Sequence, residues 1–451
     1  MGTSKKKSSI RLNRAKKKWR KELKRRGKKY DPNKNLQSKE QAVKRDLAKV
    51  NSGFISKFLR EHDKTFPDKL SDSSRINGQL FVPEPFSLLE NEKESFKFLN
   101  DIFYLLDHDM TENILIDFQY CENIDPDASI CLDLIVGEFI RYFQACRVRK
   151  VPKKLKNIRV LNHQKDSIKR VLYSIGAFTN LKGFKIKFSD VVPYPLKIGD
   201  NRSGSPEEKE VEITELVDYL RSCLKRMSKD LTPRALRDFS QIIGEILTNA
   251  EEHSTTQYRY SIGYFQEFNT SKNHYGYIKL VILNFGDTIY EKFKGPNCRN
   301  LEVKKRMEEL SNKYTRKGLF TSREFEEETL WTLYSLQEGV TSTNEKRGNG
   351  SIRFIESFFN LKGTGSKADK DSKLKLMSGN SRIIFDGTYP IKTIKKHSGE
   401  SFQVMTFNKN SDIENKPDKK FVNFVPHFFP GTILTARIVI DDEDLKNYGN
   451  D

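Results

Sequence analysis

Three polar side chains recur every four residues in the segment 244–254, which reads GEILTNAEEHS. At 3.6 residues per turn, Glu245, Asn249 and His253 fall on one face of a helix. The Asn carboxamide offers Mg²⁺ a neutral oxygen, and a Glu one turn away can polarise a water or a hydroxyl group. We expect His253 to serve packing or hydrogen bonding, because the seven histidines of the chain show no metal-ligand clustering.

The helix that positions this polar face is predicted by a second, apolar stripe. Its members recur at the complementary spacing and predict a face buried against a core: Leu236, Phe239, Ile243, Ile246 and Ala250. A Glu and an Asn on a helix more often serve solubility, so the segments that follow decide whether the pattern is a site.

Two predicted strands follow, each with a glycine at one end. Residues 278–284 (IKLVILN) predict a buried strand that ends at Asn284, and Gly286 marks the turn after it. Near the C-terminus, Gly431 and Thr432 open a strand that reads ILTARIVI. A glycine at a strand end is by itself usually a turn residue.

A glycine-rich stretch, Arg347-Gly348-Asn349-Gly350, directly precedes an apolar-periodic helix that begins near Ile352. Glycines at a helix start let backbone N–H groups approach phosphate oxygens, and the positive end of the helix dipole favours the same charge. The stretch is therefore a candidate phosphate-binding turn.

In this order, the segments resemble the GHKL family of ATP-binding domains, which includes DNA gyrase B, mismatch-repair ATPases, histidine kinases and anti-sigma-factor serine kinases. The resemblance covers roughly residues 227–440, almost half of the chain. It implies an α/β sandwich with a mixed sheet that binds ATP and Mg²⁺. The fold class expected for the whole chain is accordingly α/β (α+β).

The resemblance implies a role for each matching residue. Asn249 corresponds to the Mg²⁺ ligand, and Glu245 to the residue that acts as general base in many members. Asn284 and Gly286 match the first glycine box, which reads the adenine amino group. Thr432 matches a threonine that supports the adenine pocket from the closing strand.

The phosphate end of the site is implied by the second glycine box. Gly348, Asn349 and Gly350 match it, and the segment 287–347 before it corresponds to a mobile lid. The anion contacts expected near this end are Thr341, Ser342, Lys346 and Arg347. A solvated loop is an equally good interpretation of the two basic residues.

Two positions depart from the family pattern. Asn284 stands where the family has Asp, and Thr288 stands where it has a second glycine. An amide oxygen still accepts the adenine N–H, but the amide also carries a donor that could meet a guanine carbonyl. Thr288 adds a side chain that could alter the floor of the pocket. ATP remains the expected nucleotide.

Three functions are compatible with such a pocket. The first is an ATP·Mg²⁺-dependent switch or ATPase coupled to a protein partner. The second is a serine/threonine kinase of the anti-sigma-factor type, which acts on a separate STAS-type protein, and the third is a nucleotide sensor without turnover. Retention of Glu245 favours hydrolysis or phosphotransfer over a sensor. No phosphoacceptor helix with an exposed histidine precedes the motif, which argues against a histidine kinase.

A smaller α/β unit is expected at residues 77–190, where predicted strands alternate with amphipathic helices. Helices are expected at 93–106, 127–146 and 165–175, and strands at 113–118, 157–161 and 184–188. The passage ILIDFQYCENIDPDASICLDLI resembles the STAS fold of anti-sigma-factor antagonists. Asp125-Pro126 stands where that family has Asp-Ser, so the phosphoacceptor hydroxyl is missing. A structural or docking role follows from the resemblance.

The segment 191–211 is rich in proline and glycine and predicts a linker between this unit and an ATP-binding domain at 212–445. The amphipathic stretch 208–227 predicts a helix that packs onto the ATP-binding domain or, less favoured, onto a second copy in a homodimer.

A basic tail occupies residues 1–50. The first 34 residues hold 16 Lys and Arg against Glu22 and Asp31, whereas the whole chain carries a formal net charge of +20. Such a segment cannot bury enough apolar area to fold alone, so we expect a flexible tail. Non-specific nucleic acid contact through residues 5–34, a targeting signal, an acidic partner and plain solubilisation all remain possible roles.

Composition favours a cytoplasmic protein. The chain has no uninterrupted apolar run of about 18 residues and no apolar segment of the signal-peptide kind at its start, so no membrane partner is expected. The five cysteines lack CxxC spacing, which fits buried thiols in a reducing compartment.

Overall fold

The computed structural model describes residues 16–18, 37–43, 78–108, 113–151, 156–175, 186–201, 205–253, 256, 258–269, 274–296, 298–315, 324–342, 350–362, 366–395 and 401–441. Most of the basic tail therefore lies outside the described residues, as do Lys346, Arg347, Gly348 and Asn349. The side chain of His253 is also outside them.

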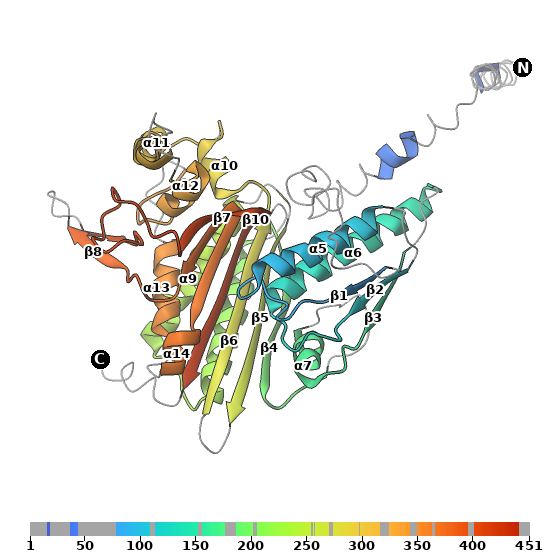
Figure 1. The fold of residues 1–451 in the computed structure, drawn as a ribbon, viewed down its shortest axis with the longest axis horizontal. Helices are drawn as coiled ribbons and strands as arrows, with labels where there is room; N and C mark the ends of the chain where they lie inside the picture. The colour runs from blue at the N-terminus through green and yellow to red at the C-terminus, as the bar shows by residue number, and fades with distance from the viewer. Residues whose placement is uncertain are drawn as a thin grey trace, which may run out of the picture.

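The centre of the molecule is a five-stranded sheet in the order β4-β5-β6-β10-β7 (Figure 1). Its strands are β4 (Val191–Asp200), β5 (Tyr258–Asn269), β6 (His274–Phe285), β7 (Lys373–Phe385) and β10 (Val422–Asp441). Every neighbouring pair is antiparallel, so the expectation of a mixed sheet is wrong. β5 and β6 pair along nearly their whole length, up to Asn269 opposite His274.

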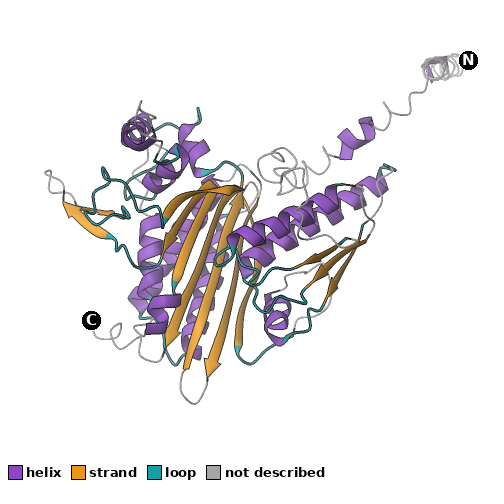
Figure 2. Ribbon diagram, viewed as in Figure 1, coloured by secondary structure: helices purple, strands orange, loops and turns teal. Residues whose placement is uncertain are grey.

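Helices cover one face of this sheet (Figure 2). They are α8 (Pro206–Arg226), α9 (Pro233–His253) and α13 (Gly350–Asn360), joined at one end by α10 (Ile289–Lys294), α11 (Leu301–Thr315) and α12 (Glu327–Ser335). The predicted apolar stripe of α9 is confirmed, since Phe239, Ile243, Ile246 and Ala250 are buried and Leu236 packs against the same core. The stripe predicted for α8 is also buried in this core, as expected for a packing helix.

The opposite face of the sheet is covered by α5 (Glu92–Asp107) and α6 (Pro126–Val148). Beyond them lies a three-stranded parallel sheet of β1 (Gln79–Phe81), β2 (Asn113–Asp117) and β3 (Asn157–Leu161), with α7 (Asp166–Ile175). One hydrophobic cluster joins both helices to Val281 and Leu283 of β6. Because β6 is covered on both faces, its sequence is an apolar run rather than an alternation.

Two smaller elements complete the described fold. The short helix α14 (Ser366–Asp371) precedes β7, and the hairpin of β8 (Lys392–Lys395) and β9 (Ser401–Val404) projects beside α13 (Figure 1).

The predicted linker at 191–211 is wrong. Residues 191–200 form β4, and α8 begins at Pro206. Pro193 and Pro195 gave the segment its linker composition, but β4 is an edge strand and pairs only with β5. An edge strand tolerates proline because one side of its backbone needs no partner, and the register also shifts between Tyr194 and Lys197.

Most elements predicted for the first unit are confirmed within a few residues, with one exception. Residues 186–188, the described part of the strand expected at 184–188, form no strand, and the chain enters β4 only at Val191. That strand belongs to the five-stranded sheet rather than to the smaller one.

The described part of the chain contains no helix that is both long and apolar enough to span a membrane. All five cysteines are free and buried, as their spacing predicts.

Candidate functional site

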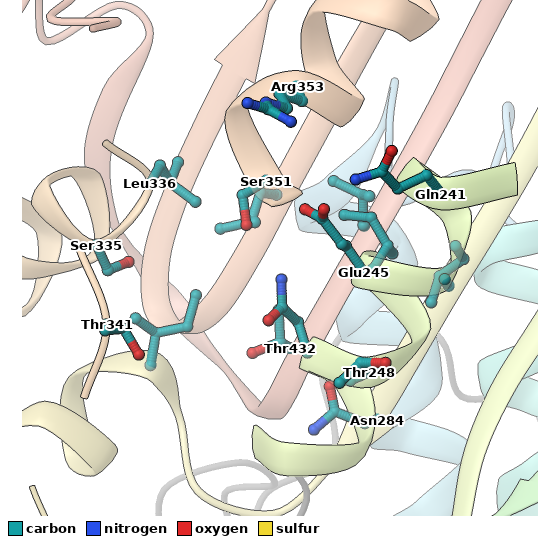
Figure 3. A pocket seen from close by; sticks show the side chains of 18 of the residues that line it. Gln241, Glu245, Thr248, Asn284, Ser335, Leu336, Thr341, Ser351, Arg353 and Thr432 are labelled. Atoms are coloured by element: carbon teal, nitrogen blue, oxygen red, sulfur yellow. The ribbon is translucent and has the colours of Figure 1, made fainter. Parts of the chain in front are cut away.

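A cavity of about 900 Å³ opens between α9, the sheet and α13 (Figure 3). The helix α9 forms one wall, and the end of α12 with the segment 336–342 after it forms another. Its floor is apolar, with Ile282 and Leu434 from the central strands and Phe293 from α10. Polar side chains stand around this floor, which is the usual character of a small-molecule site.

The polar stripe of α9 faces this cavity. Gln241, Glu245 and Asn249 line it at successive turns, and Thr248 lies beside them. Glu245 and Asn249 are each half-buried and have no hydrogen-bond partner among the described residues. In Figure 3, Gln241 and Glu245 point toward the first turn of α13. The spacing read from the sequence therefore does place a carboxylate and a carboxamide side by side in a cavity.

The sheet contributes a row of polar residues, one from each of four adjacent strands. Asn284 of β6 stands opposite Arg259 of β5 and opposite Thr432 of β10, and Thr432 stands opposite Ser378 of β7. Directly opposed residues share a face of an antiparallel sheet, and this face is the one that α9 covers. We call these four residues the polar row.

Hydrogen bonds fix the end of the row at β7 and β10. The Ser378 hydroxyl accepts the backbone N–H of Ile289 at 2.9 Å and donates to the carbonyl of Gly431 at 3.0 Å. Its contact with the Thr432 hydroxyl is 3.1 Å. The single hydroxyl hydrogen of Ser378 is already donated to Gly431, so Thr432 is the donor in this contact. The Thr432 oxygen therefore keeps its lone pairs for the cavity that it lines.

Gly431 is required at this crossing of strands. Its φ is +142°, and a Cβ there would lie 2.1 Å from the carbonyl oxygen of Asn284. A side chain would therefore push β10 away from the residue that forms the base of the cavity.

At the other end of the row, Arg259 is 4% exposed and pairs with Glu212 of α8 at 2.7 Å. Glu212 also accepts the hydroxyl of Ser261 at 2.8 Å. Between this ion pair and Thr432, Asn284 is 2% exposed, and its Nδ2 has no hydrogen-bond partner in the part of the chain that the structure describes. A buried amide donor without an acceptor costs about 1–3 kcal/mol, so Asn284 has a hydrogen bond to offer to a group in the cavity.

Two cations at the cavity were not singled out from the sequence. Lys209 of α8 lines it and holds Glu251 at 2.9 Å, and Arg353 of α13 lines it with Glu338 4.0 Å away. Arg353 is 43% exposed, so its guanidinium is accessible to a ligand. Both residues come from helices that fold against α9, and only the helical periodicity of α13 could have signalled Arg353.

The remaining predicted positions have mixed outcomes. Thr341 and Ser342 line the cavity. Gly286 instead lies in the turn behind it, where its φ is +139° and its backbone N–H donates a hydrogen bond to the Pro430 carbonyl. Gly350 is the first residue of α13. Thr288 does not line the cavity; its hydroxyl accepts the N–H of Glu291 and caps α10.

A second charged cluster lies on the opposite face of the sheet. Lys279 of β6 pairs with Asp125, which also accepts the Ser87 hydroxyl, and Lys375 of β7 pairs with Glu92 at 3.0 Å. These contacts join the chain before α6 to the two strands that carry Asn284 and Ser378.

The two buried aspartates of this cluster differ in pKa. Although burial opposes it, the Lys279 ammonium holds the pKa of Asp125 below its usual value. Burial, with the negative charge of Asp125, raises the pKa of Asp127 to about 7. One oxygen of Asp127 has no hydrogen-bond partner among the described residues, which agrees with a protonated carboxyl group.

With this geometry established, the chain was compared with known proteins. No protein-family model, no curated protein and no solved structure matches it. The assignment of the cavity therefore depends on its own chemistry.

Proposed function

We propose that the chain binds ATP with Mg²⁺ in the cavity in front of α9 and acts as an ATP-dependent switch or ATPase coupled to a protein partner. The observation that carries the proposal is the convergence of Glu245, Asn249, Asn284 and Thr432 on one cavity of about 900 Å³. These residues come from three elements that are far apart in the sequence. The proposal includes a GHKL-type architecture for residues 212–445 and a STAS-like one for 77–190.

The cavity has the features that a nucleotide needs. Its apolar floor suits a purine ring, and the unpartnered amide of Asn284 offers that ring a hydrogen bond. Lys209 and Arg353 bring positive charge to the same cavity for a triphosphate. Thr341 and Ser342 add hydroxyl groups from the segment after α12.

The residues present also suit Mg²⁺. Asn249 offers one neutral oxygen, and the described residues contain no cluster of three or more His, Cys, Asp or Glu that would hold a metal without help. Mg²⁺ is commonly bound by one or two protein oxygens together with substrate phosphates and waters. When bound, the ion would supply positive charge against the phosphates.

In the ATPase reaction, Glu245 would act on the attacking water. The water oxygen forms a bond to the γ-phosphorus, the bond from that phosphorus to the β,γ-bridging oxygen breaks, and Glu245 accepts the proton of the water. ADP and phosphate are the products.

A protein kinase is the second candidate. A smaller cavity of about 410 Å³ shares Gln241 and Arg353 with the first and reaches to β9. It offers room for a second substrate beside the phosphate end, where Glu245 could accept the proton of a serine hydroxyl instead of water. A non-hydrolysing sensor remains the third candidate.

Incubation with γ-labelled ATP and Mg²⁺ tests the proposal and separates the candidates. Released labelled phosphate is the outcome expected of the ATPase, and a labelled second protein in cell extract is that expected of the kinase. Binding without transfer of label identifies a sensor. Absence of binding in equilibrium dialysis at millimolar ATP would refute the nucleotide site.

A further inference from the structure

The base end of the cavity presents an amide where a carboxylate is the expected adenine reader. Asn284 is 2% exposed, lines the cavity and leaves its Nδ2 without an acceptor among the described residues. An amide donates and accepts, whereas a carboxylate only accepts. The residue therefore differs from Asp in the hydrogen-bond pattern that it offers, and not only in charge.

No neighbour in the polar row accepts a hydrogen bond from the amide of Asn284. Arg259 carries only donors and is held by Glu212 at 2.7 Å. Thr432 is paired with Ser378 at 3.1 Å. No acceptor among the described residues meets the Nδ2 of Asn284, so an acceptor on a ligand could satisfy it.

Both purine edges can supply it. Adenine offers an amino donor next to the N1 acceptor, and a 6-oxopurine offers a carbonyl acceptor next to the N1–H donor. A 180° rotation about the Cβ–Cγ bond exchanges the donor and acceptor of Asn284, so the same amide matches either edge. A carboxylate offers only acceptors, so it would match one position of each edge and repel the other, which is N1 of adenine or the oxygen of a 6-oxopurine.

We propose that this site accepts adenine and 6-oxopurine nucleoside triphosphates alike, and that Asn284 is the residue that determines this tolerance. The inference rests on the proposed nucleotide site and extends it to a second substrate class, guanine and hypoxanthine nucleotides. The Thr432 hydroxyl, with its free lone pairs, supports either base as an acceptor.

Calorimetric titration of the full chain with ATP, GTP and ITP in the presence of Mg²⁺ tests the tolerance without any substitution. ITP keeps the 6-oxo edge but lacks the 2-amino group, so it isolates the edge that faces the amide. We expect the three dissociation constants to lie within about tenfold of one another. A bidentate pair of hydrogen bonds discriminates between bases by a factor of about 5 to 150, so a ratio below tenfold lies under most of that range. A preference for ATP of more than tenfold over both others would overturn the tolerance.

The variant Asn284→Asp tests the role of the residue. We expect it to weaken ATP and ITP at least tenfold relative to GTP, because guanine alone presents two adjacent donors, N1–H and the 2-amino group, to the two carboxylate oxygens. Circular dichroism and thermal unfolding check the fold. Asn269→Asp makes the same change at an exposed position and should leave all three affinities unchanged. Asn269 lies at the end of β5 that is far from Arg259, the residue opposite Asn284. An unchanged GTP-to-ATP ratio in folded Asn284→Asp would overturn the role of Asn284. Failure of all three triphosphates to bind would instead overturn the nucleotide site, and the tolerance with it.

Discussion

Glu245 and Asn249 differ from ordinary polar residues on a helix surface because a cavity lies in front of them. Their spacing, their half-buried state and the absence of described hydrogen-bond partners distinguish them from solvated side chains. Lys209 lines the same cavity but differs from them, because its ammonium is engaged by Glu251. At the level of residues, the site is a carboxylate and an amide available to a ligand.

Replacing Asn249 with Ala removes the proposed metal ligand. We expect Mg²⁺-dependent ATP affinity to fall at least tenfold, because the triphosphate loses the protein oxygen that shares its ion. Titration calorimetry with and without Mg²⁺ measures the effect. Asn269→Ala, at an exposed position, is the control, and an unchanged Mg²⁺ dependence in Asn249→Ala would remove the residue from the metal site.

The sequence predicted some of these residues and not others, for a physical reason. Glu245 and Asn249 share one helix, and a spacing of four residues places them on one face whatever the rest of the chain does. Arg353 and Lys209 meet them only through the packing of α13 and α8 on α9, which no local pattern contains. The polar row likewise depends on strand register, so its geometry appears only in the folded sheet.

At the level of elements, the strands that position the row were harder to predict than the helices. The composition of β4 indicated a linker because prolines are common in linkers, yet its edge position makes them acceptable in a strand. Thr288 was expected in the pocket floor, and instead it belongs to the capping box of α10 with Glu291. In both cases, the tertiary position of the element decided the role of the residue.

The crossing of β10 and β6 gives a prediction at this scale. Gly431→Ala should destabilise the fold by about 1–3 kcal/mol, because it combines a strained φ of +142° with a Cβ 2.1 Å from the Asn284 carbonyl. It should also weaken ATP binding, since β10 and the strand that carries Asn284 must move apart.

Gly387→Ala is the matched control, with φ +89° but no atom closer than 4.0 Å to the added Cβ. Urea unfolding and ATP titration of both variants make the comparison. If the two variants lose equal stability and bind ATP equally well, close packing at Gly431 has no effect on the site.

At the scale of the whole molecule, the smaller unit and the central sheet are joined by buried charge as well as apolar contact. Lys279–Asp125 and Lys375–Glu92 bind the chain around α5 and α6 to β6 and β7. Asp127 lies in the same region, near Asp125 and Lys375, and accepts the N–H groups of Leu88 and Ala128.

The raised pKa of Asp127 predicts a pH dependence of stability. The folded protein holds this proton up to a pH of about 7, whereas the unfolded chain releases it near 3.8. Unfolding therefore releases a proton between these values, and the free energy of unfolding falls as pH rises through this window, by at most about 1.4 kcal/mol per unit.

Asp127→Asn should flatten this decline, whereas Asp166→Asn, at an exposed position of α7, should preserve it. Urea unfolding at pH 5, 6, 7 and 8 measures the slopes. The same slope in Asp127→Asn as in the unaltered protein would assign the pH dependence to other groups.

The coverage of β6 on both sides has a practical consequence for dissecting the protein. A recombinant fragment that starts at residue 212 omits β4 and leaves Tyr260, Ile262, Val281 and Leu283 facing water instead of α5 and α6. It also leaves Lys279 and Lys375 without their carboxylates. A shortened chain intended for biochemical work should therefore begin before Gly78, so that both layers are retained.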